Sequence, residues 1–237
     1  MKKLLILTTF VFIITFGDAK SEPIFHEKFY PPGDGPFPTV LLLHTSGGYK
    51  TVGKNVKYYV SRGYAVYTPD YYKRYGIKKR TRQSGFYEDR ENIDKDLLEL
   101  ISFIKKDSRV DAKNLFAVGY SAGNFPAVFL TSSNLVSAGS GHFVVWKPNF
   151  GRRSDDSDEY PAKYFTKSSS PFLAIHAEDD DTQRYSSASL AWQIIRKGGF
   201  NIETETFKTG GHPFKDNEIV ERSVDITDKF FRKHIKR

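Results

Sequence analysis

Three groups of residues in this chain could together perform nucleophilic catalysis. Ser121 lies between two glycines in "GYSAG" (119–123), His212 lies in "TGGHPF" (209–214), and an acidic run occupies residues 178–181. A serine hydroxyl is a poor nucleophile at neutral pH and needs a base, which in turn needs an orienting carboxylate. These residue types predict acyl transfer with Ser121 as nucleophile and His212 as base.

His212 is favoured over the other histidines because of its position. It follows an alternating, strand-like segment (201–207) and precedes the last amphipathic helix, so it should lie at the same sheet edge as Ser121. His44 and His176 also end predicted strands at that edge, and we interpret them as hydrogen-bonded residues that shape its rim.

Predicted strands and helices alternate along the chain. Strands are expected at 39–44, 64–70, 114–119, 171–177 and 201–207, with a less distinct one at 143–146. Helices are expected at 54–63, 88–106, 122–131, 186–197 and 216–234. This alternation predicts a mostly parallel sheet covered by helices on both faces.

Ser121 falls at the junction of a predicted strand and a predicted helix. A sharp turn there would expose the hydroxyl, and the flanking glycines would let strand and helix pass closely. The amide of Ala122 could then stabilise an oxyanion, together with a second amide from the small-residue loop 44–48. The alternative is a glycine-bounded turn with an inert serine.

Residues 39–212 resemble the α/β-hydrolase superfamily, and most closely the dienelactone hydrolase-like serine hydrolases. The resemblance is carried by "VLLLHTSGG", "YAVYTPDYY", "DLLELISFIKKDSRVDAKNLFAVGYSAG", "PFLAIHAEDD" and "GGHPF". It implies an α/β-hydrolase fold with a minimal cap domain or none, no cofactor and no metal. The chain order of serine, acid and histidine is also that of the superfamily.

The resemblance also assigns the site residue by residue. Ser121 takes the place of the nucleophile and His212 that of the base. Asp180 is the preferred acid, since Ala177 takes the glycine's place in the family's H-G-x-x-D-like stretch; Asp179 is the fallback. The oxyanion donors are the amide of Ala122 and, in the 44–48 loop, best that of Ser46.

The chain departs from the family pattern at several positions. Thr45 and Asn124 stand where glycine is common, and the chain has no cysteine, the nucleophile of dienelactone hydrolases proper. The first strand or two of the usual sheet are expected to be missing, because few residues precede Thr39.

The first residues predict export. Lys2 and Lys3 precede the apolar run 4–16, and Gly17 and Ala19 suit a cleavage site, so residues 1–19 read as a signal peptide. Residues 20–237 would form one exported domain, periplasmic or secreted. An uncleaved anchor is the alternative, but the apolar run is short for a membrane span, so no stable membrane insertion is expected after cleavage. The net charge of +8 comes with no recognisable nucleic-acid-binding module, so no nucleic-acid partner is expected.

The sequence therefore predicts an exported serine hydrolase that cleaves carboxylic esters of small molecules, esterase-like or lactonase-like, through an acyl-enzyme on Ser121. One alternative is a small peptidase resembling the prolyl oligopeptidase group, whose members usually carry a large additional domain for which this chain has no room. Another is a hydrolase-like binding protein without turnover.

The segment 71–82, "YYKRYGIKKRTR", follows a predicted strand at the edge where ligands bind in such folds. We expect Tyr71, Tyr72 or Arg74 to flank the acyl pocket and to favour esters that bear a carboxylate. The alternative is a solvated basic loop.

Overall fold

A computed structural model describes residues 23–24, 26–78, 85–86, 88–146 and 164–237. The predicted signal peptide lies outside the described residues. The strands are β1 (His26–Phe29), β2 (Phe37–Leu43), β3 (Ala65–Pro69), β4 (Val110–Tyr120), β5 (Ala138–His142), β6 (Phe172–Ala177) and β7 (Glu203–Phe207). The helices are α1 (Gly53–Val60), α3 (Arg90–Ile104), α4 (Asn124–Ser132), α6 (Tyr185–Lys197) and α7 (Asn217–Lys233), with short 3-10 turns η1 (Tyr49–Thr51) and η2 (Ser121–Gly123).

The strands form one seven-stranded sheet in the order β1-β3-β2-β4-β5-β6-β7. All neighbouring strands are parallel except β1, which runs antiparallel to β3 at the edge. This confirms the predicted α/β class with a mostly parallel sheet. It also shows a first strand at His26–Phe29, within the region where the sequence suggested that strands were missing.

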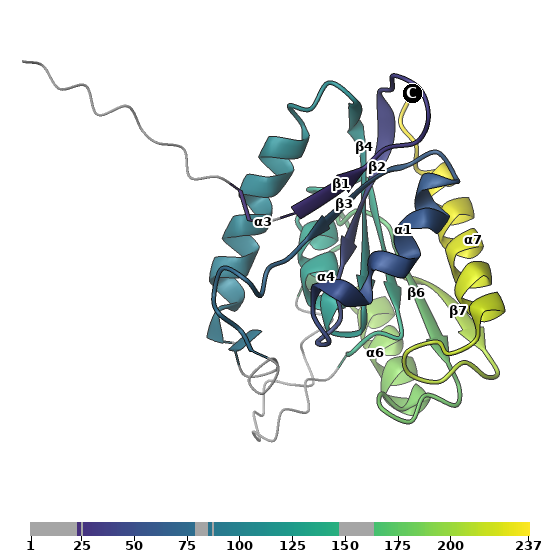
Figure 1. The fold of residues 1–237 in the computed structure, drawn as a ribbon. Helices are drawn as coiled ribbons and strands as arrows, with labels where there is room; N and C mark the ends of the chain where they lie inside the picture. The colour runs from purple at the N-terminus through teal and green to yellow at the C-terminus, as the bar shows by residue number, and fades with distance from the viewer. Residues whose placement is uncertain (1–22, 25, 79–84, 87, 147–163) are drawn as a thin grey trace, which may run out of the picture.

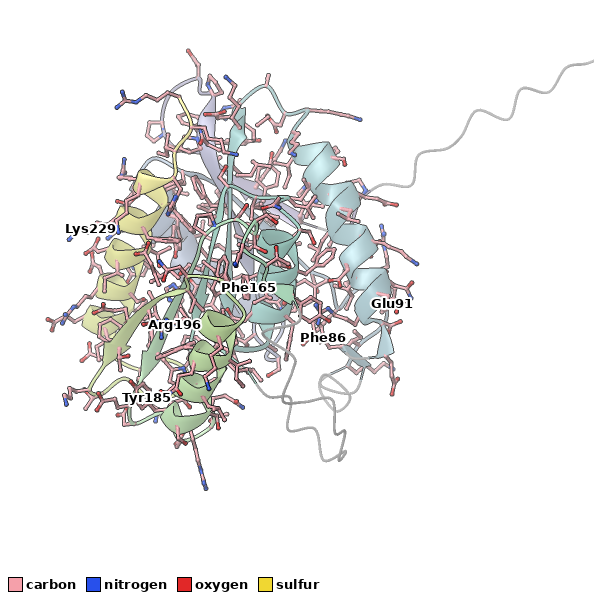
Figure 2. The ribbon with its side chains drawn as sticks, turned by 180° about the vertical axis from the view of Figure 1, so that it is seen from behind. Phe86, Glu91, Phe165, Tyr185, Arg196 and Lys229 are labelled. Carbon is pink, nitrogen blue, oxygen red and sulfur yellow. The ribbon has the colours of Figure 1, made fainter. Side chains whose placement is uncertain are left out.

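Helices cover both faces of the sheet (Figure 1). Helices α1 and α7 pack on one face, and α3, α4 and α6 on the other. Strand β2 shows why both layers form: Val40 and Leu42 point to the first layer, and Leu41 and Leu43 to the second. Such a continuous apolar strand is typical of a parallel sheet buried on both sides. Figure 2 shows the two layers from behind, with Lys229 on α7 and Glu91 on α3 at opposite sides of the molecule.

Strand β5 lies earlier in the chain than the predicted strand at 143–146. Its sequence "AGSGH" has no branched apolar residue, so the usual strand signal is weak. The small residues are needed because α4 lies very close. A Cβ atom on Gly139 would lie 2.1 Å from Thr131 Oγ1, and one on Gly141 would lie 2.1 Å from Asn124 Oδ1.

A partly buried carboxylate fixes the edge of the sheet. Asp107, just beyond the end of α3, accepts hydrogen bonds from the hydroxyls of Tyr30 (2.5 Å) and Tyr67 (2.8 Å) and from the Lys28 ammonium (3.1 Å). Burial alone would raise the pKa of Asp107, but these bonds and the amide of Arg109 hold it well below its usual range. The carboxylate therefore ties β1 and β3 to the α3 layer.

We predict that Asp107→Asn lowers the free energy of unfolding by about 1–2 kcal/mol at neutral pH, because it removes charge-assisted hydrogen bonds. A depressed carboxyl pKa contributes stability that is present above the unfolded-state pKa of about 4 and is lost as pH falls through the folded-state value. The difference in the free energy of unfolding between wild type and variant, measured by urea denaturation, should therefore be smaller at pH 3 than at pH 7.

Asp34→Asn, at an exposed aspartate, is the control and should be neutral at both pH values. A difference of equal size at pH 3 and pH 7, or no difference at all, would contradict this role for Asp107.

Candidate active site

The turn between β4 and α4 places Ser121 in a strained conformation. Its φ angle is 51°, in the left-handed region that L-residues other than glycine rarely adopt. Glycine is required on both sides of it. A Cβ atom on Gly119 would lie 2.5 Å from the carbonyl oxygen of Gly123, and one on Gly123 would lie 2.2 Å from that of Leu43. Strain of this kind is commonly stored at functional sites, which favours a working serine over an inert one.

Ser121, His212 and Asp180 form a continuous chain of hydrogen bonds. Ser121 Oγ lies 2.9 Å from His212 Nε2, and His212 Nδ1 lies 2.9 Å from Asp180 Oδ2. Since an ionised carboxylate can only accept, Nδ1 carries the proton and Nε2 accepts from the serine hydroxyl. This is the arrangement in which histidine can remove the serine proton.

Asp180 is kept ionised by the groups around it. Its side chain is 0% exposed, and burial alone would raise its pKa. Hydrogen bonds from His212 and from the amide of Gln183, together with the charge of a protonated His212, outweigh burial and lower the pKa of Asp180. Asp180 Oδ1 accepts from the amides of Thr182 (2.9 Å) and Gln183 (2.6 Å), which fix the carboxylate in place.

Asp179, the alternative acid, has a different partner. Its Oδ1 accepts the amide of Gly211 at 2.8 Å, immediately before His212. Gly211 has a φ of 70°, which suits glycine in the tight turn that presents the histidine. The ring of Phe143 packs edge-on against the His212 ring at 5.0 Å. Asp179 and Phe143 thus hold the histidine loop in position.

Asn124 supports the nucleophile, a role that the sequence analysis missed. It was noted only as a departure from glycine, yet its Nδ2 donates to the carbonyl of Ser121 at 2.9 Å and to that of His142 at 3.3 Å. Asn124 is 1% exposed and bridges the strained turn to the end of β5. A polar residue within an otherwise apolar helix start was the only sequence signal.

The loop after β2 leaves one of its amides without a partner. The amide of Thr45 donates to Thr51 Oγ1, that of Gly47 to Thr45 Oγ1, and that of Gly48 to the carbonyl of Thr45. Among residues 45–48, the amide of Ser46 is therefore the one that has no partner within the described chain. Thr45, where relatives have glycine, uses its hydroxyl to fix this loop.

The rim histidines lie where the sequence predicted them and are fully buried. His176 Nε2 lies 2.7 Å from the carbonyl of Gln183, and burial lowers the pKa of His176. The ring of His44 stacks on that of Tyr71 at 3.7 Å, and the Tyr71 hydroxyl donates to the carbonyl of His44. Neither histidine is hydrogen-bonded to Ser121 within the described chain.

Two of the predicted substrate-binding residues, Tyr71 and Tyr72, pack against the His44 ring. Tyr71 and Tyr72 are 1% and 5% exposed, and Arg74 forms an ion pair with Asp96 on α3 at 2.5 Å. Lys79, Arg80 and Arg82 lie outside the described residues. A role of Tyr71, Tyr72 or Arg74 in binding an acyl group stays a prediction.

None of the helices in the described chain is both long and apolar enough to cross a membrane. No group of three or more histidine, cysteine, aspartate or glutamate side chains in the described ranges is placed to hold a metal ion.

The parallel sheet, the strained serine turn and the loops at its carboxyl edge define an α/β-hydrolase. The model of the dienelactone hydrolase family matches residues 28–227, so the chain belongs to that family. No curated protein matches the sequence significantly.

Solved structures of hydrolases have a similar fold. YeeB, a sugar hydrolase from Lactococcus lactis, is 17% identical with a TM-score of 0.68, and the match covers 88% of this chain and 94% of YeeB. Esterase 2 of Thermogutta terrifontis, with propionate bound, is 16% identical with a TM-score of 0.66, covering 88% of each chain. A Bacteroides ovatus structure assigned as a dipeptidyl aminopeptidase IV is 16% identical with a TM-score of 0.70, covering 89% of this chain but 33% of that one.

We predict that Asp180→Asn lowers the kcat of the enzyme by roughly 10³-fold or more, because an amide favours the wrong histidine tautomer. Asp179→Asn should cost far less, since asparagine Oδ1 can still accept from Gly211. Asp181→Asn, at an exposed position, should change the rate by less than about twofold.

Steady-state hydrolysis of an activated ester by the three variants measures these effects. Equal, mild losses at all three positions would show that the orienting acid lies elsewhere.

Proposed function

We propose that this protein is an exported serine hydrolase that cleaves carboxylic esters of small molecules through an acyl-enzyme on Ser121. The observation that carries the proposal is the unbroken line of hydrogen bonds from Ser121 through His212 to Asp180. The serine at the start of this line has a strained, left-handed backbone conformation. A turn with a purely structural role would need neither the strain nor the hydrogen-bonded partners.

The geometry supports a two-step acyl transfer. Ser121 Oγ attacks the ester carbonyl while its proton passes to His212 Nε2, and Asp180 stabilises the imidazolium. The amides of Ala122 and Ser46 donate to the oxyanion. The intermediate then collapses, the alcohol leaves with the proton from His212, and the acyl group remains on Ser121.

Water completes the cycle by the same route. His212 takes a proton from water, the hydroxide attacks the acyl-enzyme, and the second intermediate releases a carboxylic acid and the free Ser121 hydroxyl. No redox partner or cofactor enters this sequence of steps.

The comparison with solved structures favours an ester over a peptide as the substrate. The esterase with bound propionate matches the chain along most of both sequences. The aminopeptidase structure matches over only a third of its own length, so most of that protein has no counterpart here. A binding protein without turnover is disfavoured by the intact hydrogen-bonded trio.

Export rests on the sequence pattern of residues 1–19 alone. The mass of the protein purified from cells that carry the full gene tests it, since cleavage before Lys20 would leave a chain that begins at that residue.

Ser121→Ala and His212→Ala should each lower kcat toward a small ester such as p-nitrophenyl acetate by roughly 10³-fold or more. The double variant should be no worse than either single one, because the two residues act as a unit. His176→Ala should keep much more activity, since His176 contacts the Gln183 carbonyl rather than the serine. Ser133→Ala, at an exposed serine, is the matched control.

Near wild-type turnover by Ser121→Ala would contradict the proposed mechanism. A folded wild type that hydrolyses neither esters nor peptides would instead support the binding-protein alternative.

A further inference from the structure

A pocket of about 310 Å³ lies beside the triad, between the carboxyl ends of the strands and the layer of α1 and α7. Tyr120 and Phe143 line it from the strand ends, Pro213 and Phe214 from the histidine loop, and Thr45 from the loop after β2. Tyr120, Pro213 and Thr45 are the sequence neighbours of Ser121, His212 and Ser46, and the Phe143 ring contacts that of His212. The pocket is therefore lined by residues that flank the reacting groups.

Two buried polar atoms belong to residues that line this pocket. Asn55 Oδ1 and His142 Nδ1 have no hydrogen-bond partner among the described residues. Asn55 is 4% exposed and His142 is 0% exposed. Buried polar groups in native proteins are nearly always paired, so a water molecule or a ligand group is the expected partner of these two atoms.

The hydrogen-bonding role of His142 is fixed by its surroundings. Thr227 Oγ1 lies 2.9 Å from the carbonyl of Ser223, to which it donates, so it must accept from His142 Nε2 at 3.0 Å. Burial lowers the pKa of His142 to about 3, which keeps the ring neutral at physiological pH. Nδ1 is therefore an acceptor, and its expected partner is a hydroxyl, an amide or a water molecule.

The outer part of the pocket is positively charged. Lys50 and Lys54 line it from η1 and the start of α1, and no aspartate or glutamate is among the described residues that line it. Neither ammonium group forms an ion pair with a described residue. Phe143, Phe214 and Val220 add apolar side chains to the lining. This chemistry fits a small ring or short chain that ends in an anionic group.

The reaction itself indicates which part of an ester would lie there. His212 must deliver its proton to the leaving oxygen, so the leaving group lies on the His212 side of the serine. Phe143, whose ring contacts that of His212 at 5.0 Å, is a wall of the pocket, as is Pro213. The leaving group of an ester attacked by Ser121 is thus directed toward Lys50 and Lys54.

We propose that this pocket is the leaving-group subsite, and that it selects esters whose alcohol or phenol carries a carboxylate or phosphate. This inference rests on the proposed esterase function. It differs from the prediction for Tyr71, Tyr72 and Arg74, which concerns an anionic acyl group.

The test compares acetyl esters that differ only in the leaving group. Wild type should hydrolyse 4-carboxyphenyl acetate with a kcat/KM about five- to tenfold above that for neutral 4-carbamoylphenyl acetate, the range expected for two partly exposed ion pairs. In the Lys50→Gln/Lys54→Gln double variant this ratio should fall toward one, because the anionic ester loses more kcat/KM than the neutral ester. Added salt should shrink the wild-type ratio in the same direction.

Lys57→Gln is the matched control, since Lys57 is an exposed lysine of α1 that does not line the pocket. It should leave the ratio at the wild-type value. A ratio near one in wild type, or one that the double variant does not change, would overturn the proposal. The proposal would also be overturned if the double variant lost kcat/KM only toward an ester with an anionic acyl group and a neutral leaving group, such as phenyl hydrogen succinate.

Binding of 4-hydroxybenzoate, the product, gives a readout that needs no turnover. Calorimetry should show binding to wild type that is weakened severalfold in the double variant. Equal binding by the two proteins would overturn the subsite. If wild type binds 4-hydroxybenzoate more tightly than the double variant but cleaves no ester, the pocket binds the anion as proposed and the proposed esterase function is wrong.

Discussion

The left-handed backbone of Ser121 is the constraint on which the rest of the site depends. It turns the chain from β4 into α4 so abruptly that no side chain fits at Gly119 or Gly123. The unfavourable conformation persists because neighbouring groups hold it, above all the Asn124 amide on the serine's own carbonyl. The same close approach of α4 explains why β5 is made of small residues.

The site also requires a negative charge that is buried away from water, on the Asp180 carboxylate. Asp180 is fully buried, yet the hydrogen bonds from His212 and the amide of Gln183 keep its pKa low, so that it is ionised and aimed at His212 Nδ1. Asp179, one residue earlier, uses its carboxylate to fix the turn before His212. Neighbouring acids in one loop thus have separate tasks, because consecutive side chains leave the chain in different directions.

The sequence predicts the main elements well because its signals are local. Continuous apolar runs mark β2, β4 and β6, and the carboxyl ends of parallel strands meet at one edge, which places Ser121, Asp180 and His212 together. Contacts between distant segments were not predictable. Asn124 acquires its role only through the approach of β5, and Arg74 pairs with Asp96 of α3. Lys50 and Lys54 carry no motif, and only the packing of α1 beside the histidine loop gives them a pocket.

The relation between fold and chemistry is direct in this molecule. One sheet edge gathers Ser121, His212 and Asp180 into one line of hydrogen bonds, and the adjoining pocket is lined by Lys50 and Lys54. Each reacting group is positioned by a neighbour that takes no part in bond making: Asn124 for the serine, Phe143 for the histidine, and the amides of Thr182 and Gln183 for the acid.

The central claim is that Ser121 is a nucleophile activated by its neighbours. The most direct measurement is reaction of the folded protein with a fluorophosphonate, followed by mass spectrometry of the peptides. An esterase of similar fold is phosphonylated by cyclosarin, a reagent of the same class. We expect one adduct per chain, located on Ser121, and no adduct when the protein is denatured by heat before the reagent is added. A folded protein that forms no adduct, or that carries it on another residue, would contradict this role of Ser121.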